Sequence, residues 1–410
     1  MNLLSFHPRF LVLALLLLLP LACEDRAEPP GQPIDSYTIP AVEATTDRIS
    51  VYFTEPDNTA DTTDPDASPV GKALVDLIES QTSGNIYLCF YDFDYQPVID
   101  AVQNAISNGV VVYFVGDVDE STDAGYTAVT SAIIAAGGSE QETIKTSGSA
   151  KCGYSLIYPT YIMHNKFALV TDTETGKRYV WTGSTNVSES GMLYNNNNAI
   201  IVQSQDMYDI YLQQFRYLYD GSADPVSERK NITVGNVHLS ILFSYTDSGR
   251  SHENLPVSVV SAMIEEAVSA VSFMMFSFTH TDTASALISR SENGVTVRGI
   301  LDESQNNTNS DIVDMFSSAE LDFRIDGNDQ NDPHNPLGGA KLHHKCVIID
   351  PDDATNAAVV TGSTNLTNAG NDLNAENMVI LYSSDYAELF VNEFDARWEE
   401  ASSRFAGGVQ

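Results

Sequence analysis

Apolar and polar positions alternate along the chain in a pattern that occurs twice. In each half, an apolar run is followed by a helical pattern and then by a β-branched run that ends in Asp117 or Asp302. This order is typical of strand-helix-strand units in an α/β protein. The predicted helices lie at residues 96–107, 125–136, 283–291 and 311–318, and further strands are predicted at residues 167–171, 179–182, 346–350 and 357–361.

The two halves also match each other outside these elements, which indicates a duplicated domain rather than a solenoid. For example, residues 51–54 match residues 241–244. Each unit has about 165 residues, a normal size for one domain. We therefore predict a first domain at residues 48–225 and a second domain at residues 226–410.

The N-terminal segment predicts export. Arg9 precedes an almost unbroken apolar run at residues 11–19, which is short for a membrane span and is soon followed by Cys23. Residues 1–23 are therefore predicted to be an export signal of lipoprotein type, and residues 24–47, rich in Pro, Glu and Thr, a flexible tether. The protein is expected to be a cell-envelope lipoprotein, in the periplasm or outer membrane, or to be secreted.

Composition restricts the partners of the protein. The chain has 20 Lys and Arg against 56 Asp and Glu, a formal net charge of -36. Because nucleic-acid binding relies on neutralising phosphates, this charge makes nucleic acid a less favoured partner. With 43% hydrophobic residues, the chain has enough apolar side chains to form substantial cores. Cys89 and Cys346 lie in apolar runs and are predicted to be buried free thiols.

A His, a Lys and an Asn recur in the same order in both halves. The six residues are His164, Lys166, Asn186, His343, Lys345 and Asn365, and each Asn ends a Gly-Ser-Thr-Asn sequence. Residues two apart on a strand point to the same side, so each His shares a face with its Lys. Two half-sites of this composition can form one phosphate-handling site, which predicts an enzyme.

These motifs resemble the phospholipase D superfamily, whose signature is His-x-Lys, four residues, Asp, and then Gly-Ser-x-Asn. The second copy matches fully and ends in Asp350, whereas the first has five residues before Asp172, which leaves the family role of Asp172 open. The resemblance implies an α/β fold of two pseudo-symmetric α/β/α sandwich domains with the active site at their interface. It also implies a monomer, because both half-sites are in one chain.

The resemblance implies roles for the site residues as well. His164 is expected to attack phosphorus and form a phosphohistidine, while His343 protonates the leaving group and then activates water or an alcohol. The two lysines and the two asparagines are expected to hold the non-bridging oxygens. The scheme requires no metal ion and no other cofactor. Ser184 and Ser363 are expected to support their loops.

A carboxylate follows the second motif. Glu376 lies eleven residues after Asn365, where the family often has a carboxylate that orients the histidine, and the matching residue in the first half is Asn197. We therefore expect Glu376 to orient His343 and Asn197 to orient His164. Since an amide carries no charge, His164 is predicted to be the less basic imidazole.

The substrate is less well defined by the sequence. Export, anchoring and negative charge favour hydrolysis, or transphosphatidylation, of phospholipid headgroups at a membrane surface. An exported nuclease of the same superfamily is the first alternative. A non-catalytic surface lipoprotein that binds phosphorylated ligands is the second, although intact residues in both halves favour an enzyme.

Overall fold

The computed structural model of the protein describes residues 48–55, 61–140, 153–157, 162–244, 254–306, 310–326 and 340–405. All of these residues belong to one compact unit. The predicted export signal, Cys23 and the tether lie outside the described residues and stay predictions. The predicted border between the two domains, after residue 225, also stays a prediction. Within the described part of the chain, no helix combines the length and the apolar composition needed to cross a membrane.

The first half of the chain forms an eight-stranded mixed sheet with the order β1-β8-β7-β6-β2-β3-β5-β4. Strands β2, β3, β5 and β4 are parallel to one another. Strand β6 pairs antiparallel with β2, and the antiparallel series continues through β7 and β8 to β1. The strands are β1 (Ile49–Phe53), β2 (Asn85–Phe90), β3 (Val111–Asp117), β4 (Ser139–Glu140), β5 (Gly153–Ile157), β6 (Lys166–Thr171), β7 (Arg178–Gly183) and β8 (Asn198–Gln203).

The second half forms another eight-stranded sheet, with the order β13-β12-β11-β14-β15-β16-β10-β9. When the edge strands β4 and β9 are set aside, the two sheets have the same strand order, which confirms the predicted mixed α/β class with two sheets. The strands are β9 (Lys230–Val234), β10 (Val237–Phe243), β11 (Ala270–Met275), β12 (Thr296–Asp302), β13 (Asp322–Asp326), β14 (Lys345–Ile349), β15 (Ala358–Gly362) and β16 (Asn377–Tyr382).

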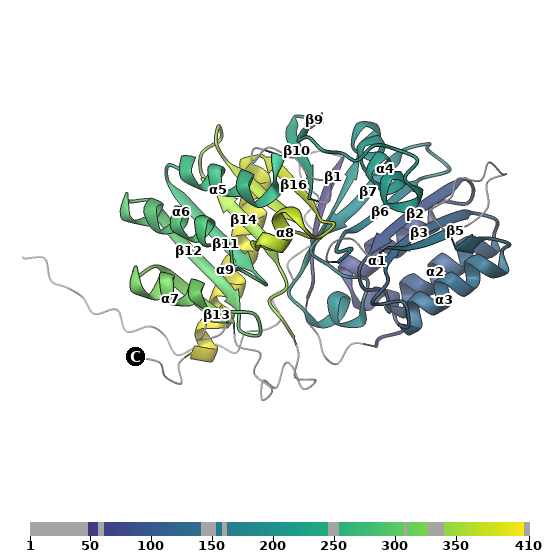
Figure 1. Ribbon diagram of the computed structural model, residues 1–410, viewed down its shortest axis with the longest axis horizontal. Coiled ribbons are helices and arrows are strands. Elements are labelled where there is room, and N and C mark those ends of the chain that lie inside the picture. Colours follow the sequence, from purple (N-terminus) through teal and green to yellow (C-terminus); the bar gives the residue numbers. More distant parts are fainter. Residues whose placement is uncertain are drawn as a thin grey trace, which may run out of the picture. The chain divides into compact units, whose positions relative to one another are not determined.

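Helices cover both faces of each sheet (Figure 1). Three helices in each half pack on one face, and a single long helix, α4 or α9, packs on the other. Shorter turns lie at Pro65–Ala67, Ser190–Tyr194 and α8 (Asn368–Asp372). The longer helices are α1 (Pro69–Glu79), α2 (Gln96–Ser107), α3 (Ala124–Ala135), α4 (Gln205–Asp220), α5 (Pro256–Glu266), α6 (Thr281–Glu292), α7 (Asp311–Ser318) and α9 (Ser384–Phe405).

The two halves share one apolar core. Its side chains come from α4, from α9 and from the sheet faces that these helices cover. On α4, the Tyr211 ring packs edge-on against Phe167 of β6 at 5.0 Å and against Phe243 of β10, in the other sheet, at 4.9 Å. Burial of such large rings is among the strongest stabilising terms in a core. The shared core therefore holds the two sheets together, and with them the strands that carry the histidine motifs.

The helix predictions agree with the structure where the apolar period was clear. Helices α2 and α7 have the predicted bounds, and α3 and α6 differ by one or two residues at their ends. Helices α1 and α5 were not predicted. Both begin with a proline, and Ser68 caps α1 by accepting a hydrogen bond from the Gly71 N–H, so a start signal was present in the sequence.

Candidate active site

Each motif histidine lies just before a central strand, and a buried aspartate that ends the second strand along the same sheet fixes that position. Asp117, the last residue of β3, accepts the Met163 N–H at 2.6 Å. Asp302, the last residue of β12, accepts the Leu342 N–H at 2.9 Å. The sequence showed an acid at the end of both β-branched runs, but its role in holding the residue before each histidine was not predicted.

The backbone of each histidine is bound by the opposite half of the chain. The His164 N–H donates to the carbonyl oxygen of Ala375, and the His343 N–H donates to that of Asn196, both at 2.9 Å. These contacts form short parallel bridges at the start of β6 and β14. The loops before β8 and β16 are thereby exchanged between the half-sites.

This exchange corrects the predicted pairing of the histidines. Nδ1 of His164 lies 2.8 Å from both carboxylate oxygens of Glu376, and Nδ1 of His343 lies 2.9 Å from Oδ1 of Asn197. Each partner therefore orients the histidine of the other half. The prediction was wrong because spacing along the chain places Glu376 on a loop, whereas the bridge between the halves decides which ring that loop meets.

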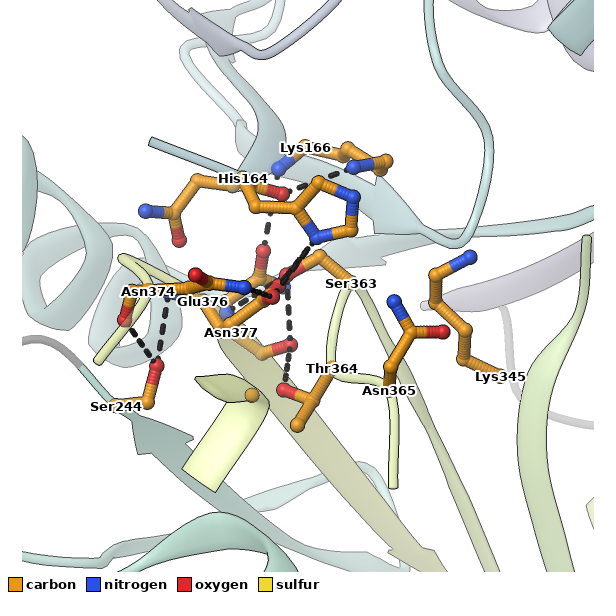
Figure 2. A network of polar contacts seen from close by, with 12 residues as sticks. His164, Lys166, Ser244, Lys345, Ser363, Thr364, Asn365, Asn374, Glu376 and Asn377 are labelled. Carbon is orange, nitrogen blue, oxygen red and sulfur yellow. Dashed lines mark hydrogen bonds and ion pairs between the residues drawn. The ribbon is translucent and has the colours of Figure 1, made fainter. Parts of the chain in front are cut away.

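The two motif serines donate hydrogen bonds to Glu376 and Asn197, the side chains that orient the histidines. Ser363 Oγ donates to Glu376 Oε2 at 2.5 Å, and Ser184 Oγ donates to Asn197 Oδ1 at 2.9 Å. Asn374 Nδ2 adds a bond of 3.0 Å to the other Glu376 oxygen (Figure 2). These contacts agree with the supporting role expected for both serines, and they leave the partner side chains little rotational freedom.

Two further hydroxyl groups tie the same loops to the sheets. Thr54, just after β1, accepts the Asn197 N–H at 2.8 Å, and Ser244, just after β10, accepts the Glu376 N–H at 3.0 Å. The repeat alignment had matched these two positions, but it gave them no role. The signal available was a hydroxyl residue at the end of the first strand in both halves.

Both histidines are almost fully buried, with exposed fractions of 7% for His164 and 6% for His343. Burial lowers the pKa of His164 to about 4, an effect that the Glu376 carboxylate opposes and that the charges of Lys166 and Lys345 strengthen. Burial, together with the charges of the same two lysines, lowers the pKa of His343 well below its usual range. The carboxylate that favours the charged ring therefore acts on His164 and not on His343, the reverse of the predicted arrangement.

The hydrogen bonds define where each ring holds its proton. Glu376 accepts from His164 at Nδ1, so Nε2 of the neutral ring is unprotonated. Asn197 Oδ1 likewise accepts from Nδ1 of His343, and Nε2 of this ring takes a hydrogen bond from Lys345 Nζ at 3.1 Å. In the free protein, both rings thus carry a lone pair at Nε2.

The two motif lysines are buried in the same site. Burial lowers the pKa of Lys166 to about 8 and that of Lys345 well below its usual range. Each Nζ donates to the carbonyl oxygen of its own histidine at 2.9 Å. Figure 2 shows Lys345 and Asn365 beside the contacts that hold His164. Because both lysines act electrostatically on both histidines, the two half-sites form one site.

Asn365 is oriented by the loop after β11. Its Oδ1 accepts the Ser277 N–H at 3.2 Å, which leaves the amide nitrogen as the end that can donate to an anion. Asn186 occupies the equivalent place in the first half, and its Oδ1 is buried without a hydrogen-bond partner in the described part of the chain. Of the two predicted asparagines, Asn365 thus has its side-chain oxygen bound by the backbone of its own half, whereas that of Asn186 is unbound within the described residues.

The two motif aspartates lie at the far ends of their strands, away from the histidines. Asp350 accepts the N–H groups of Val268, Ser269 and Ala270, at 2.7 to 3.1 Å, and so fixes the start of β11. Asp172 accepts from residues of its own exposed turn, the Glu174 N–H at 2.9 Å and the Thr175 N–H at 3.1 Å. The extra residue before Asp172 therefore gives it a different contact, and neither aspartate touches a histidine ring.

Aromatic rings flank the site on both sides. The Tyr91 ring lies 5.4 Å from the His164 ring, and the Phe276 ring lies 4.7 Å from the His343 ring. Next to Tyr91, the carboxylates of Asp92, Asp94 and Asp123 have oxygens within 4.8 Å of one another, close enough to share a cation. Such acidic groups also occur without an ion, and the sequence had not indicated this one.

The fold and the two His-Lys pairs define an α/β protein with one site built from two half-sites, an arrangement that fits a phosphodiesterase. A family model described as cardiolipin synthase, PLD-like domain, matches residues 74–219 and 260–398. Since these ranges cover more than half of the chain, the protein belongs to the phospholipase D-like family.

Individual relatives match over part of the chain. The protein is 28% identical over 149 residues to the mitochondrial cardiolipin hydrolase of Mus musculus, which covers 36% of this chain and 61% of the relative. It is 27% identical over 135 residues to a phospholipase D of Rickettsia conorii, which covers 33% of this chain and 60% of the relative. The chain thus spans less than two thirds of these relatives.

A solved structure shares the fold over most of the chain. Phosphatidylserine synthase from Haemophilus influenzae superposes with a TM-score of 0.54 at 13% identity, covering 80% of this chain and 84% of that protein. At this identity the likeness concerns the fold alone.

Proposed function

We propose that the protein is a phosphodiesterase of phospholipase D type, with His164 as the nucleophile and His343 as the general acid and base. The observation that carries the proposal is the contact between His164 Nδ1 and the Glu376 carboxylate in a site that also holds two buried lysines. A ring in this position has a free lone pair on one nitrogen and a negative charge behind the other.

In the first step, His164 Nε2 attacks phosphorus and the bond from phosphorus to the leaving oxygen breaks. The ring becomes cationic when the nitrogen-phosphorus bond forms, and Glu376 stabilises that charge at 2.8 Å. The lysines neutralise the non-bridging oxygens, and the amide groups of Asn186 and Asn365 donate hydrogen bonds to them. The charge asymmetry between the two histidine partners therefore supports His164, rather than His343, as the nucleophile.

His343 delivers a proton to the leaving oxygen. In the free protein its Nε2 has no proton, so the ring has to take one up from solvent before the leaving group departs, and the negative charge of a bound phosphodiester favours the charged ring. In the second step, His343 removes a proton from water or an alcohol, which attacks phosphorus and displaces His164. Hydrolysis and transfer differ only in this acceptor.

The proposed substrate is a phospholipid headgroup. Relatives named cardiolipin hydrolase and phospholipase D, and a family model described as cardiolipin synthase, support a lipid phosphodiester. The net charge of -36 supports the same choice, because a polyanionic nucleic acid would be repelled at long range.

The test is turnover of cardiolipin, phosphatidylcholine and phosphatidylethanolamine vesicles in EDTA, with single-stranded DNA alongside. We expect release of a phosphatidic acid or phosphatidylglycerol product by wild type and none by His164→Ala, while the surface variant His238→Asn keeps full activity. Turnover of DNA alone would move the protein to a nuclease, and no turnover of any phosphodiester would leave only the binding-protein alternative. A ³²P-labelled protein trapped with His343→Ala would identify the phosphohistidine.

Export and anchoring are proposed on the N-terminal sequence alone. The short apolar run before Cys23 supports a signal of lipoprotein type. Membrane fractionation with labelled palmitate should place wild type in the membrane fraction and Cys23→Ser in the soluble fraction. Equal distribution of both proteins would contradict lipidation.

A further inference from the structure

Four consecutive asparagines of the first half, residues 195–198, each use their side chain to bind the second half. Asn195 Oδ1 accepts the Lys341 N–H at 2.9 Å, and Asn196 Oδ1 accepts from Arg397 at 2.9 Å. Asn197 binds His343, as described above. Asn198 Nδ2 lies 3.0 Å from His344 Nδ1, and its Oδ1 accepts from Thr361 at 2.6 Å. The residue that orients His343 is therefore held on both sides.

Two of these contacts end on one buried charged group. His344, directly after His343, donates from Nε2 to Glu393 Oε1 at 3.0 Å, and Arg397 Nε lies 3.3 Å from the same oxygen. His344 and Glu393 are completely buried, and both Glu393 and Arg397 come from α9. The charged group thus connects α9 to Asn196 and Asn198, the neighbours of Asn197.

The protonation state of His344 follows from its two partners. The Asn198 amide nitrogen can only donate, so Nδ1 of His344 has to be an acceptor, and the proton is on Nε2. Burial lowers the pKa of His344, which agrees with a neutral ring. Burial raises the pKa of Glu393, but Arg397 and His344 outweigh this effect and lower it. The group is therefore a neutral imidazole next to a carboxylate-guanidinium pair.

The first half has a neutral counterpart of this group. His343 follows His164 by 179 residues, and the same offset relates Asn165 to His344, Gln214 to Glu393 and Leu218 to Arg397. The first half therefore lacks both charges. Its histidine, His164, instead has a charged partner, the Glu376 carboxylate, both of whose oxygens lie close to the ring Nδ1.

The half whose histidine is oriented by a neutral amide is the half that contains the buried charged group. His164 is oriented strongly by Glu376, because a carboxylate attracts the ring N–H with both geometry and charge. His343 has only a neutral amide, whose single oxygen attracts the ring weakly. Its orientation depends on how rigidly residues 196–198 are held, and the buried charged group is what holds them from the side of α9.

We infer that His344, Glu393 and Arg397 are positioning residues that fix Asn197 through its two neighbours and thereby aim His343 at the leaving oxygen. This inference rests on the proposed phosphodiesterase function. Proton transfer in the transition state depends on a hydrogen bond of about 2.6–3.2 Å, so a loosened ring loses efficiency as an acid. The side chains of the positioning residues contact Asn196 and Asn198, the two neighbours of Asn197, through Arg397 and His344, and Glu393 contacts both of these residues.

The test replaces the charged group by the neutral residues of the first half. The variant His344→Asn, Glu393→Gln, Arg397→Leu is assayed with aryl methyl phosphodiesters whose phenols differ in pKa. A good leaving group departs without a proton, whereas a poor one requires the acid. We expect rates within about 2-fold of wild type for 4-nitrophenol and losses of about 10-fold or more for phenols of pKa near 10.

The matched control is Arg298→Leu. Arg298 also packs on α9, through Asp395 and the Trp398 ring, but it contacts none of the four asparagines. It should change all substrates equally or not at all. A uniform loss across the series in the triple variant, or no loss, would overturn the inference. If the triple variant does not fold, His344→Asn alone is assayed in the same series and is held to the same two outcomes.

A second measurement separates this inference from the proposed function. The ¹⁵N chemical shift of His343 Nδ1 reports whether its proton still bonds to Asn197, and it requires no turnover. We expect a changed or averaged shift in the triple variant and an unchanged shift in Arg298→Leu. An unchanged shift in the triple variant would overturn the inference. No turnover by wild type would instead contradict the phosphodiesterase proposal while leaving the positioning claim measurable.

Discussion

Glu376 and His164 come from opposite halves of the chain, yet both carboxylate oxygens of Glu376 lie 2.8 Å from Nδ1 of His164. His343 meets the amide of Asn197 instead. The duplicated chain therefore exchanges the partners of its two histidines, and the exchange places the only charged partner of the two behind the proposed nucleophile.

The first prediction concerns the order of the two histidine pKa values. In wild type, we expect His164 to titrate above His343, because only His164 has a carboxylate that favours the charged ring. Glu376→Gln should lower the pKa of His164, and Asn197→Asp should raise that of His343. Histidine ¹H-¹³C NMR spectra recorded between pH 3 and 8 measure both values. A higher pKa for His343 in wild type would contradict the assignment of partners.

The same substitution should affect the first chemical step. Without its charged partner, the His164 ring cannot carry the positive charge of the phosphohistidine at low cost, so we expect Glu376→Gln to reduce kcat by about 10²-fold or more. Rapid-quench measurement of phosphoenzyme formation is the direct assay. The change Glu399→Gln, at an exposed position of α9, serves as the control and should have little effect.

The alkaline limb of activity should come from the buried lysines. Burial lowers the pKa of Lys166 to about 8 and moves that of Lys345 in the same direction, so both lose their charge at a lower pH than an exposed lysine would. We expect kcat/KM to fall as pH rises through about 8, because the non-bridging oxygens lose their cations. Lys166→Arg and Lys345→Arg keep the charge at high pH. At least one of them should extend the plateau, and an unchanged limb in both would refute the assignment.

The sequence predicts those parts of this site that depend on residues close together in the chain, and it misses those that depend on residues far apart in the chain. The six motif residues and the face shared by each His-Lys pair follow from local spacing and the strand period. The partner of each histidine does not, because it depends on a bridge between residues about 200 positions apart, such as His164 and Ala375. The run at residues 195–198 looks like a polar loop in the sequence, and only the structure gives each side chain a different partner.

The contacts of the two motif aspartates could not be predicted from the sequence for a related reason. Strand β14 ends one residue before Asp350, whose side chain then binds the backbone at the start of β11. In the first half, the residue at this place is Thr171, and its N–H donates to Gln81 instead. The spacing from the histidine to the motif aspartate therefore predicts where the strand ends. It does not predict which backbone groups the carboxylate binds, because this differs between the two halves.

Acid should destabilise the folded protein through its buried histidines. An unfolded histidine has a pKa near 6.5, whereas that of His164 is about 4 in the folded state, so between these values the unfolded chain binds more protons. The free energy of unfolding therefore decreases as pH falls through this window, by about 3 kcal/mol for His164 alone. Urea unfolding at pH 7, 5.5 and 4.5 measures the effect. His164→Asn removes one titrating group and should show a shallower decrease, and equal slopes would argue against a neutral buried ring.

Asp117 and Asp302 bind the residues just before the two histidines. Replacing either aspartate should lower the free energy of unfolding by a similar amount, because the two make the same contact in the two halves. Asp117→Ala leaves the buried N–H of Met163 without its acceptor, and Asp302→Ala does the same to Leu342. Each change should cost about 1–3 kcal/mol and should lower activity, since the freed residue is next to the histidine. Asp353→Ala is the control, because Asp353 caps an exposed turn and its loss should cost under about 0.5 kcal/mol. Chemical denaturation of the three variants decides the matter: a large cost for one site aspartate and none for the other would show that the two half-sites do not depend on the same scaffold.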